Sequence, residues 1–334
     1  MLALIVRRLI QLPFILLIIF TLTLALAWAT PGSPLDKVDG RQPSEQVREA
    51  MKRQYNLDSF PRFFISYFRS ATGYAYLSDW LSGRLAQERE QAARLNQPPP
   101  VRRVFDLGPS LQYEDQRVND ILVGALPVSI TLGSAAMLVA LAIGLVAGVI
   151  GAIKPNSLAD LATLAIAMIG ISLPNFVIGT ALLLVFGAWM GIFPVARWGP
   201  WGAVLPTITL SLPFAAYIAR LTRMGMIDVL SADFIRTARA KGVSESRVVL
   251  RHALKNAFLP VLSYLGPAAA LAMTGSFVVE RVFSVPGMGQ FFVEAVRNKD
   301  LFLISGVVLV FSTLLIVFNL AVDVLYRWVD PRIE

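Results

Sequence analysis

A charged segment lies between Ser231 and Pro260, with long apolar runs on both sides. It holds two sets of cations, Arg236, Arg239 and Lys241, then Arg247, Arg251 and Lys255, and the second set recurs every four residues. Residues four apart share one face of a helix, so these cations can form a charged stripe that binds an acidic surface. A loop can also be basic simply because positive charge keeps it in the cytoplasm. Either way, the chemistry is recognition, without bond making or breaking.

The sequence lacks the residue sets needed for catalysis, phosphate binding or metal binding. The nucleotide-binding pattern G-x-x-x-x-G-K-[ST] does not occur, and no carboxylate pair or nucleophile with a base can be assembled. The chain has no cysteine, and its single histidine, His252, has no second imidazole with which to chelate a metal. We therefore expect a non-catalytic protein that binds no cofactor or metal of its own.

The cationic cluster is predicted to form two helices joined by a glycine hinge. Ser231 is predicted to cap the first helix, and Gly242 to end it, because the position after a helix favours a residue that tolerates positive φ. The second helix restarts at Ser244. Each helix carries an apolar ridge beside its cations: Phe234, Ile235 and Ala238 in the first, and Leu250, Leu254 and Phe258 in the second.

Composition identifies the chain as an integral membrane protein. Of its 334 residues, 56% are hydrophobic and 16% are charged, whereas soluble domains average about 25% charged residues. Mean hydropathy is +0.63. The net charge of +8 could indicate a nucleic-acid partner, but the cations lie beside apolar spans and lack interleaved aromatic residues. We therefore expect membrane lipid, and no nucleic acid, among the partners.

Six apolar segments are predicted to cross the membrane as helices, which gives an all-α fold. Each is long enough for the roughly 30 Å hydrocarbon layer, and they cover residues 9–30, 129–153, 161–189, 204–221, 258–279 and 301–320. The first could be a cleaved signal peptide ending near Ala25-Leu26-Ala27, but its long apolar core favours a retained span. Thirteen Lys and Arg residues fall on short inner segments and four on short outer ones, so both termini are predicted to be cytoplasmic.

The predicted domain plan has four parts. Residues 1–30 form the first span, 31–120 a long extracytoplasmic region, 121–325 a five-helix core with a cytoplasmic loop at 225–257, and 326–334 the cytoplasmic end. The external region contains an aromatic helix, Phe60–Phe68, and a stretch, Ser70–Arg103, with a charged helix predicted at Leu81–Leu95. We expect this stretch to be a solvated elaboration, because charge runs usually face water; contact with a binding protein is the alternative.

Two proline positions are predicted to interrupt the spans. Pro127 should separate an external lead-in from the second span, and Pro174-Asn175 should break the third span near its middle. Broken helices and polar side chains within a bilayer tend to line a cavity. The candidate translocation path therefore consists of Pro174, Asn175, Thr207, Thr209 and Ser211. The hydroxyls could instead be satisfied within their own helix.

The external segment after the fifth span is a candidate gate or hairpin, with Glu280, Pro286, Gly287 and Gly289 as its residues. Proline and glycine there suit a re-entrant or tightly turned hairpin, and an ordinary surface turn is the alternative. At the inner end of the last span, Asp323 and Arg327 are spaced for an i, i+4 ion pair.

Three signatures resemble those of one family of transport proteins. The first signature lies in the cationic segment and has two pieces, FIRTARAKG at Phe234–Gly242 and RHALKNAFLP at Arg251–Pro260. The second is ERVFSVPGMG at Glu280–Gly289, and the third is NLAVDVLYRWVDPR at Asn319–Arg332. In this order, within a six-span plan, they are similar to permease subunits of ATP-binding-cassette (ABC) importers of the dipeptide, oligopeptide and nickel branch. Arg236 and Thr237 replace the Glu-Ala opening of the general permease pattern, and Lys255 stands where many relatives carry proline. Both departures are associated with the peptide branch. Ser70–Arg103 is the stretch outside the resemblance.

The resemblance implies a type I importer permease with no ATPase activity of its own. A homologous second permease would complete the pore, two ATPase subunits would bind ATP and Mg, and an extracytoplasmic solute-binding protein would deliver a peptide at the inner membrane of a prokaryote. The coupling loop would dock in an ATPase groove through Asp233, Phe234, Ile235, Arg236, Thr237, Ala238, Arg239, Lys241 and Gly242. Closing of the ATPase pair would then move the spans between inward-open and outward-open states.

Two other functional classes remain as alternatives. An ion-coupled secondary transporter usually carries charged residues at the membrane midplane, whereas the charges here lie near the ends of the spans. A non-transporting scaffold would leave the three signatures without a purpose. Within the importer class, a nickel chelate, glutathione and an oligosaccharide are alternative cargoes.

Overall fold

The computed structural model describes residues 2–36, 44–99, 101–113, 115–273 and 276–329. Within these ranges the regular elements are helices, and the bridge between Pro109 and Arg117 is isolated. The predicted all-α class is therefore confirmed. The chain divides into two compact units, one of residues 1–12, 125–290 and 313–334, the other of residues 13–124 and 291–312. Pro100 and the last residues of the closing signature, Asp330–Arg332, lie outside the described residues.

Five helices in the described part of the chain are long and apolar enough to cross a bilayer. They cover Val6–Ala29, Val118–Ile153, Val204–Leu230, Glu245–Val282 and Leu301–Val324. A sixth crossing results if the bent pair Leu158–Ser172 and Asn175–Trp189 counts as one span. The predicted six-span plan corresponds to this second count.

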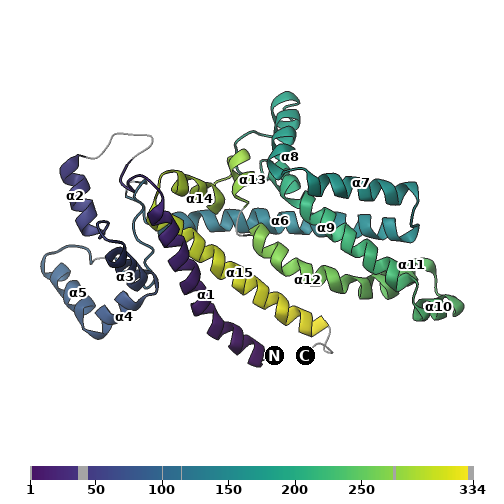
Figure 1. Ribbon diagram of the computed structural model, residues 1–334, viewed down its shortest axis with the longest axis horizontal. Helices are drawn as coiled ribbons and strands as arrows, with labels where there is room; N and C mark the ends of the chain where they lie inside the picture. Colours follow the sequence, from purple (N-terminus) through teal and green to yellow (C-terminus); the bar gives the residue numbers. More distant parts are fainter. Residues whose placement is uncertain (1, 37–43, 100, 114, 274–275, 330–334) are drawn as a thin grey trace. The chain divides into compact units, whose positions relative to one another are not determined.

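Long helices lie side by side in the first unit, as Figure 1 shows for α6 (Val118–Ile153), α7 (Leu158–Ser172), α9 (Val204–Leu230) and α12 (Leu254–Met273). Small residues let their backbones approach closely. A Cβ on Gly133 of α6 would lie 2.3 Å from the Ala272 carbonyl oxygen of α12, and one on Gly144 would lie 2.7 Å from Ile218 of α9. Glycine at these two positions is thus required for the packing of α6 against both neighbours.

Pro127 does not divide the second span, which corrects the prediction. It lies inside the continuous helix α6. A proline removes one backbone hydrogen bond, the one that its own N–H would donate to the carbonyl oxygen four residues earlier. The remaining helical bonds hold the chain, because a break within the bilayer would leave further backbone groups without partners.

Pro174, in contrast, breaks the third span more sharply than expected. α7 ends at Ser172, and α8 (Asn175–Leu182) continues into a π-helix, η1 (Leu183–Trp189), at 103° to α7. Leu173 is extended, with φ −83° and ψ 132°, because the residue before a proline avoids helical backbone angles. The result is a bent pair of short helices.

The predicted cytoplasmic loop 225–257 is mostly helical, as expected for its two predicted helices. α9 continues to Leu230, and a short helix, α10 (Asp233–Ala240), follows it. After Gly242 the chain is helical again through α11 (Glu245–Arg247), the π-helix η2 (Val248–Ala253) and α12. Beyond α12 come α13 (Phe277–Val282) and α14 (Met288–Arg297).

The second unit is built on aromatic packing between α1 (Leu2–Ala29) and α3 (Phe60–Ala71). Trp28 lies 5.6 Å from Phe63, and Phe20 lies 5.4 Å from Phe64, measured between ring centroids. Phe302, at the start of α15 (Leu301–Val329), meets the Phe63 ring at 5.3 Å. The predicted aromatic helix is therefore confirmed, and its buried face forms the core of this unit.

Three further helices complete the second unit: α2 (Glu45–Gln54), α4 (Tyr74–Leu81) and α5 (Arg84–Arg94). The helix predicted at Leu81–Leu95 begins later than expected, because Gly83 has a φ of +70° and separates α4 from α5. Asp300 caps α15: its carboxylate is buried and accepts the Leu303 N–H at 3.1 Å and the Ser110 hydroxyl at 2.5 Å. Burial raises the pKa of this carboxyl.

Candidate functional site

The coupling segment, which we define as residues 231–253, has the predicted helix, glycine and helix order. Gly242 has a φ of +74°, in the region that favours glycine. Its N–H donates to the Arg239 carbonyl oxygen at 2.9 Å, and the Val243 N–H donates to that of Ala238 at 3.2 Å. These bonds satisfy the last carbonyls of α10, so the predicted glycine stop is confirmed.

Ser231 does not cap α10, which corrects the prediction. It is the C-cap of α9, has helical angles (φ −83°, ψ −12°), and donates its hydroxyl to the Asp228 carbonyl oxygen at 2.7 Å. The N-cap of α10 is Ala232, whose backbone is extended. An N-cap needs non-helical angles, and the tight turn from α9 supplies them one residue later than expected. Ser244 does precede the next helix as predicted.

The apolar ridge of α10 is divided between the chain's own core and its surface. Ile235 is fully buried in a cluster with Met226 of α9, Ala152 of α6 and Val248 of η2. Ala238 packs against the same cluster, whereas 47% of Phe234 is exposed. The prediction that all three residues form one outward face is therefore corrected: Ile235 holds α10 to the ends of α6 and α9, and Phe234 faces outward.

The charged residues of α10 lie on the surface, and both of its arginines are paired with carboxylates within the segment. Arg239 donates to both carboxylate oxygens of Glu245, at 2.7 and 3.2 Å, and this hydrogen bonding raises the pKa of the Arg239 guanidinium. Arg236 meets the Asp233 carboxylate at 3.5 Å. The exposed members of the predicted set are Asp233, Phe234, Arg236, Thr237, Arg239, Lys241 and Gly242.

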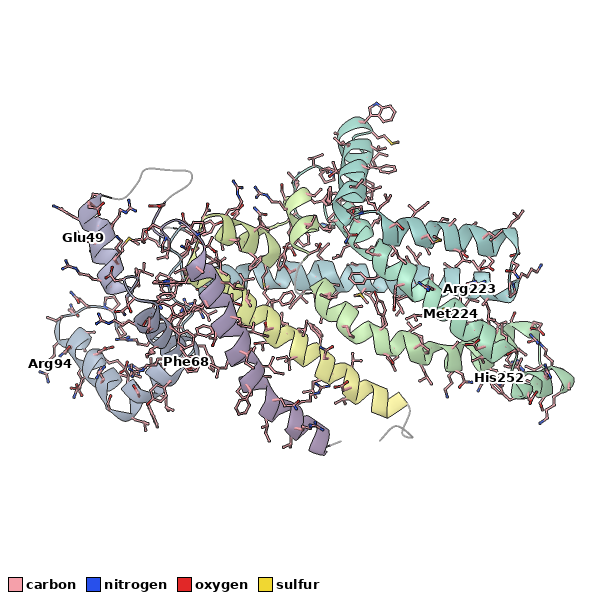
Figure 2. All side chains as sticks on the ribbon, in the orientation of Figure 1. Glu49, Phe68, Arg94, Arg223, Met224 and His252 are labelled. Atoms are coloured by element: carbon pink, nitrogen blue, oxygen red, sulfur yellow. The ribbon has the colours of Figure 1, made fainter. Side chains whose placement is uncertain are left out.

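A buried ion pair next to this segment was missed by sequence reasoning. The Asp160 carboxylate, near the start of α7, accepts Arg223 Nε at 2.5 Å and Nη2 at 2.7 Å. It also accepts the Asn156 N–H at 2.8 Å, so it fixes the turn between α6 and α7. Arg223 belongs to α9 and is labelled in Figure 2. The spacing Ser157-x-x-Asp160 indicates a helix start, but nothing in the sequence names an arginine 63 positions away.

The external hairpin is assembled around the buried carboxylate of Glu280. Ser129 of α6 donates its hydroxyl to Glu280 Oε1 at 2.9 Å and accepts the Met288 N–H at 2.9 Å. The Gly289 N–H donates to Glu280 Oε2 at 2.7 Å. A Cβ on Gly287 would lie 2.5 Å from the same oxygen. The structure therefore brings Glu280, Gly287 and Gly289 together, and Ser129 is a member that the sequence did not suggest.

The three hydroxyl residues of the candidate path are enclosed within the chain. Thr207, Thr209 and Ser211 are buried in α9, and the last two donate their hydroxyls to the Leu205 and Ile208 carbonyl oxygens, each at 2.8 Å. A Cβ on Gly179 of α8 would lie 3.1 Å from the Thr209 methyl, so α8 covers this part of α9. Asn175 is half-buried and Pro174 exposed.

Asp323 of α15 is paired with an arginine in the first helix. Its carboxylate accepts Arg8 Nη2 at 3.0 Å, and both groups lie in the first unit. The side chain of Arg327, the predicted partner, lies outside the described residues. The bond joins the N-terminal part of α1 to the C-terminal part of α15.

Comparison with known proteins reveals relatives over the whole length. Residues 140–334 match the family described as binding-protein-dependent transport system inner membrane component. The chain is 38% identical to the dipeptide transport system permease protein DppB of Bacillus subtilis over 320 residues, 96% of this chain and 94% of that one. It is 36% identical to the oligopeptide transport system permease protein OppB of Haemophilus influenzae over 100% of both chains. This second match extends over the chain from end to end, and the expectation that residues 70–103 lie outside the resemblance stays a prediction.

Solved structures share the fold. The MetNI methionine ABC transporter, solved in inward-facing conformations, matches with a TM-score of 0.51 and 17% identity, over 63% of this chain and 97% of the other. At this identity the likeness concerns architecture alone, and it agrees with the expected type I importer permease fold.

Proposed function

This chain belongs to the family of inner membrane components of binding-protein-dependent transport systems and is a permease subunit of an ABC importer, and we propose that its cargo is peptides. The observation that supports peptides as the cargo is the match, over nearly the full chain, to permeases named for dipeptide and oligopeptide transport. Family membership disfavours the ion-coupled transporter and the scaffold.

In the proposed assembly, this chain forms half of the pore with a homologous second permease. Two ATPase subunits bind beneath it and supply the ATP and Mg chemistry, and an extracytoplasmic solute-binding protein delivers the peptide. The chain itself is a non-catalytic, multi-pass protein of the prokaryotic inner membrane, with both termini in the cytoplasm. The thirteen-to-four distribution of cations between short inner and outer segments supports this orientation.

The coupling segment is proposed to transmit the ATPase motion. Phe234 enters an apolar groove of an ATPase, and the cations Arg236, Arg239 and Lys241 face its acidic rim. Ile235 connects α10 to the inner ends of α6 and α9, so a displacement of α10 moves these helices with it. A packed core transmits such a movement because it resists compression.

The remaining sites are proposed to form the outer end of the transport path. The hairpin of Glu280, Pro286, Gly287 and Gly289 acts as an external gate next to α8, since Phe283 contacts Gly179. Pro174, Asn175, Thr207, Thr209 and Ser211 line the path once α8 moves away from α9. The bent junction of α7 and α8 supports such a movement, because its two extended residues can absorb a change in angle.

Purification and transport together test the proposed function. The tagged chain, isolated in mild detergent, is expected to co-purify with a second permease and two ATPase chains. Reconstituted with the solute-binding protein, this complex is expected to import labelled dipeptides or oligopeptides only when ATP and Mg are present. Uptake by the chain alone without nucleotide would instead establish a secondary transporter, and import of a nickel chelate, glutathione or an oligosaccharide in place of peptide would overturn the cargo.

A charge substitution at the hinge tests the coupling segment. Gly242→Asp is expected to leave membrane insertion unchanged and to remove most ATP-driven uptake. A Cβ at this position meets open space, so the main change is an anion beside Arg239 and Lys241. Gly242→Asn is the matched control, since asparagine has the same size and both residues tolerate positive φ better than most. It is expected to retain most uptake, and normal uptake by the aspartate variant would exclude the segment from coupling.

A further inference from the structure

The helix α4, in the extracytoplasmic part of the chain, exposes an unusual number of large apolar side chains. Tyr74 is 57% exposed, Leu77 51%, Trp80 62% and Leu81 70%. A contiguous apolar patch of this kind marks a surface that is covered in the working protein. The expectation that residues 70–103 are solvated suits the charged helix α5, whereas the apolar surface of α4 suits a covered position.

The packing of α3 on α1 shows at what depth α4 begins. The start of α3 meets Trp28, with Phe60 at 5.7 Å, and the end of α3 meets Phe20, with Phe68 at 5.9 Å. Phe20 precedes Trp28 by eight residues, so it lies about 12 Å further along α1, at 1.5 Å per residue. Tryptophan favours the membrane interface, and half of the hydrocarbon layer is about 15 Å thick. The end of α3 thus reaches the hydrocarbon of the outer leaflet.

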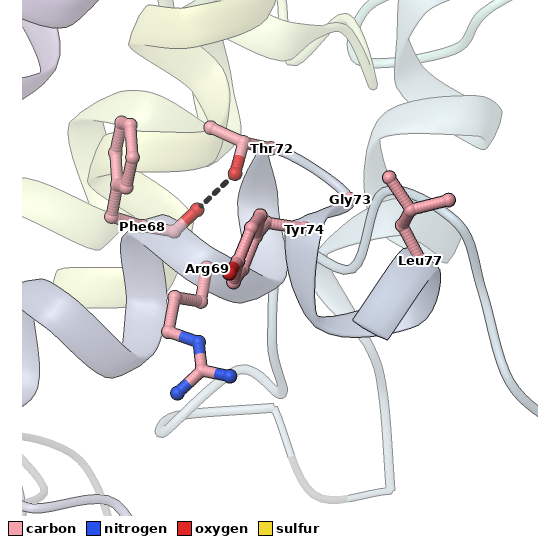
Figure 3. A pocket seen from close by; sticks show the side chains of 6 residues that line it. All are labelled: Phe68, Arg69, Thr72, Gly73, Tyr74 and Leu77. Atoms are coloured by element: carbon pink, nitrogen blue, oxygen red, sulfur yellow. Dashed lines mark hydrogen bonds between the residues drawn. The ribbon is translucent and has the colours of Figure 1, made fainter. Parts of the chain in front are cut away.

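The turn from α3 to α4 lines an open hollow that suits a lipid chain. Its volume is about 480 Å³, and its lining is Phe68, Arg69, Thr72, Gly73, Tyr74 and Leu77. The Thr72 hydroxyl donates to the Phe68 carbonyl oxygen at 2.7 Å, so its polar atom is occupied and the walls are largely apolar (Figure 3). The Arg69 guanidinium lies 5.3 Å from the centre of the Tyr74 ring, and a long cationic side chain of this kind can extend to the phosphate level.

We propose that α4 and this hollow form a lipid-binding element that inserts into the outer leaflet, with acyl chains against Tyr74, Leu77, Trp80 and Leu81 and a lipid phosphate at Arg69. The depth argument favours lipid over a soluble binding protein, because α4 continues from a segment that lies along a membrane span. Gly83 then ends the element, and α5 returns to water with exposed charges such as Glu90. The proposal depends on the membrane position of α1 and is independent of the cargo.

Site-directed spin labelling tests this insertion. The chain has no cysteine, so Leu77→Cys, Leu81→Cys and, as the water-exposed control, Glu90→Cys each introduce one thiol for a nitroxide. Each full-length variant is purified with its partner chains and reconstituted in phosphatidylcholine vesicles. The cysteine-free parent chain, treated in the same way, gives the background signal from thiols of the partner chains. Collisions with a water-soluble nickel complex are expected to be about tenfold or more rarer at positions 77 and 81 than at 90, because polar solutes are excluded from hydrocarbon. Collisions with oxygen are expected to be more frequent.

Two outcomes would overturn the proposal. Equal access of the nickel complex to all three labels would place α4 in water. Protection of positions 77 and 81 from both oxygen and the nickel complex would show that protein, such as the solute-binding protein, covers α4. High oxygen access together with low nickel access at these two positions is the result that supports insertion into lipid.

Discussion

Replacing Asp160 with asparagine is expected to remove most ATP-driven uptake while the protein remains inserted in the membrane. Asparagine keeps the size of the side chain, but its amide group is a donor. Both carboxylate oxygens of Asp160 accept hydrogen bonds, from Arg223 Nε, Arg223 Nη2 and the Asn156 N–H. In either orientation, the amide NH2 group would face an N–H donor of Arg223 or Asn156. The substitution would also leave the Arg223 guanidinium without its counter-charge.

The expected loss is one of transmission, because the ion pair joins α7 and α9, two helices that the proposed mechanism moves. Arg223 lies eight residues before Ser231, about 12 Å along α9 at 1.5 Å per residue. Asp160 holds the start of α7, whose other end meets the bent junction with α8. In the proposed mechanism, a movement of the coupling segment passes through α9 and this pair to α7. Without the pair, ATP hydrolysis should continue and respond less to the loaded solute-binding protein.

The matched control for Asp160→Asn is Arg220→Gln, which removes an exposed cation one turn earlier on α9. It is expected to leave both uptake and stimulated ATP hydrolysis close to normal. The double variant, which combines Asp160→Asn with Arg223→Gln, should recover part of the uptake, since the two amides can bond each other, and such non-additivity identifies a direct interaction. Independent, additive losses would show that the two residues act separately.

Local chemistry explains which parts of the fold could be predicted. The break at Pro174 and the stop at Gly242 follow from the backbone limits of proline and glycine, which act within one or two residues. The spans follow from length and apolar composition, which a bilayer demands of any helix. Pro127 was misjudged because a long helix can continue through a proline, which removes one of its many backbone hydrogen bonds.

Features that depend on distant parts of the chain could not be predicted. Ile235 is buried because Met226 and Val248 converge on it, and a helical ridge alone does not say whether its partner is the same chain or another. Asp323 has a candidate partner four residues away, yet it binds Arg8 at the opposite end of the chain. In both cases the outcome is decided by tertiary packing, which periodicity within one helix does not record.

The external hairpin combines features set by local turn chemistry with features that depend on distant parts of the chain. Its glycines were predicted from turn chemistry, but the reason for their positions is the Glu280 carboxylate, which leaves no room for a Cβ at Gly287 or Gly289. Ser129 came from a different helix and had no distinguishing signal within its apolar run. The sequence thus indicated a turn, and the structure shows a buried acceptor that the turn surrounds.

Replacing Glu280 with alanine is therefore expected to loosen the hairpin and to abolish regulated transport. The change removes the acceptor of the Ser129 hydroxyl and the Gly289 N–H. Each buried donor left without a partner costs about 1–3 kcal/mol, and the lost side chain also leaves a cavity. We expect a lower midpoint of thermal unfolding for the detergent-purified complex, faster protease cleavage between α13 and α14, and loss of peptide uptake.

Two further substitutions separate the hairpin's geometry from its charge. Gly289→Ala keeps the carboxylate but places a Cβ 2.8 Å from both Glu280 Oε2 and the Phe277 Cα, so it should reproduce the faster cleavage and the loss of uptake. Val278→Ala, at a residue of α13 that is 48% exposed, is the control and should change neither. If Gly289→Ala and Glu280→Ala both transported peptide normally at an unchanged unfolding midpoint, the hairpin would be an ordinary surface turn, and control of the outer end of the path would have to lie in another part of the chain.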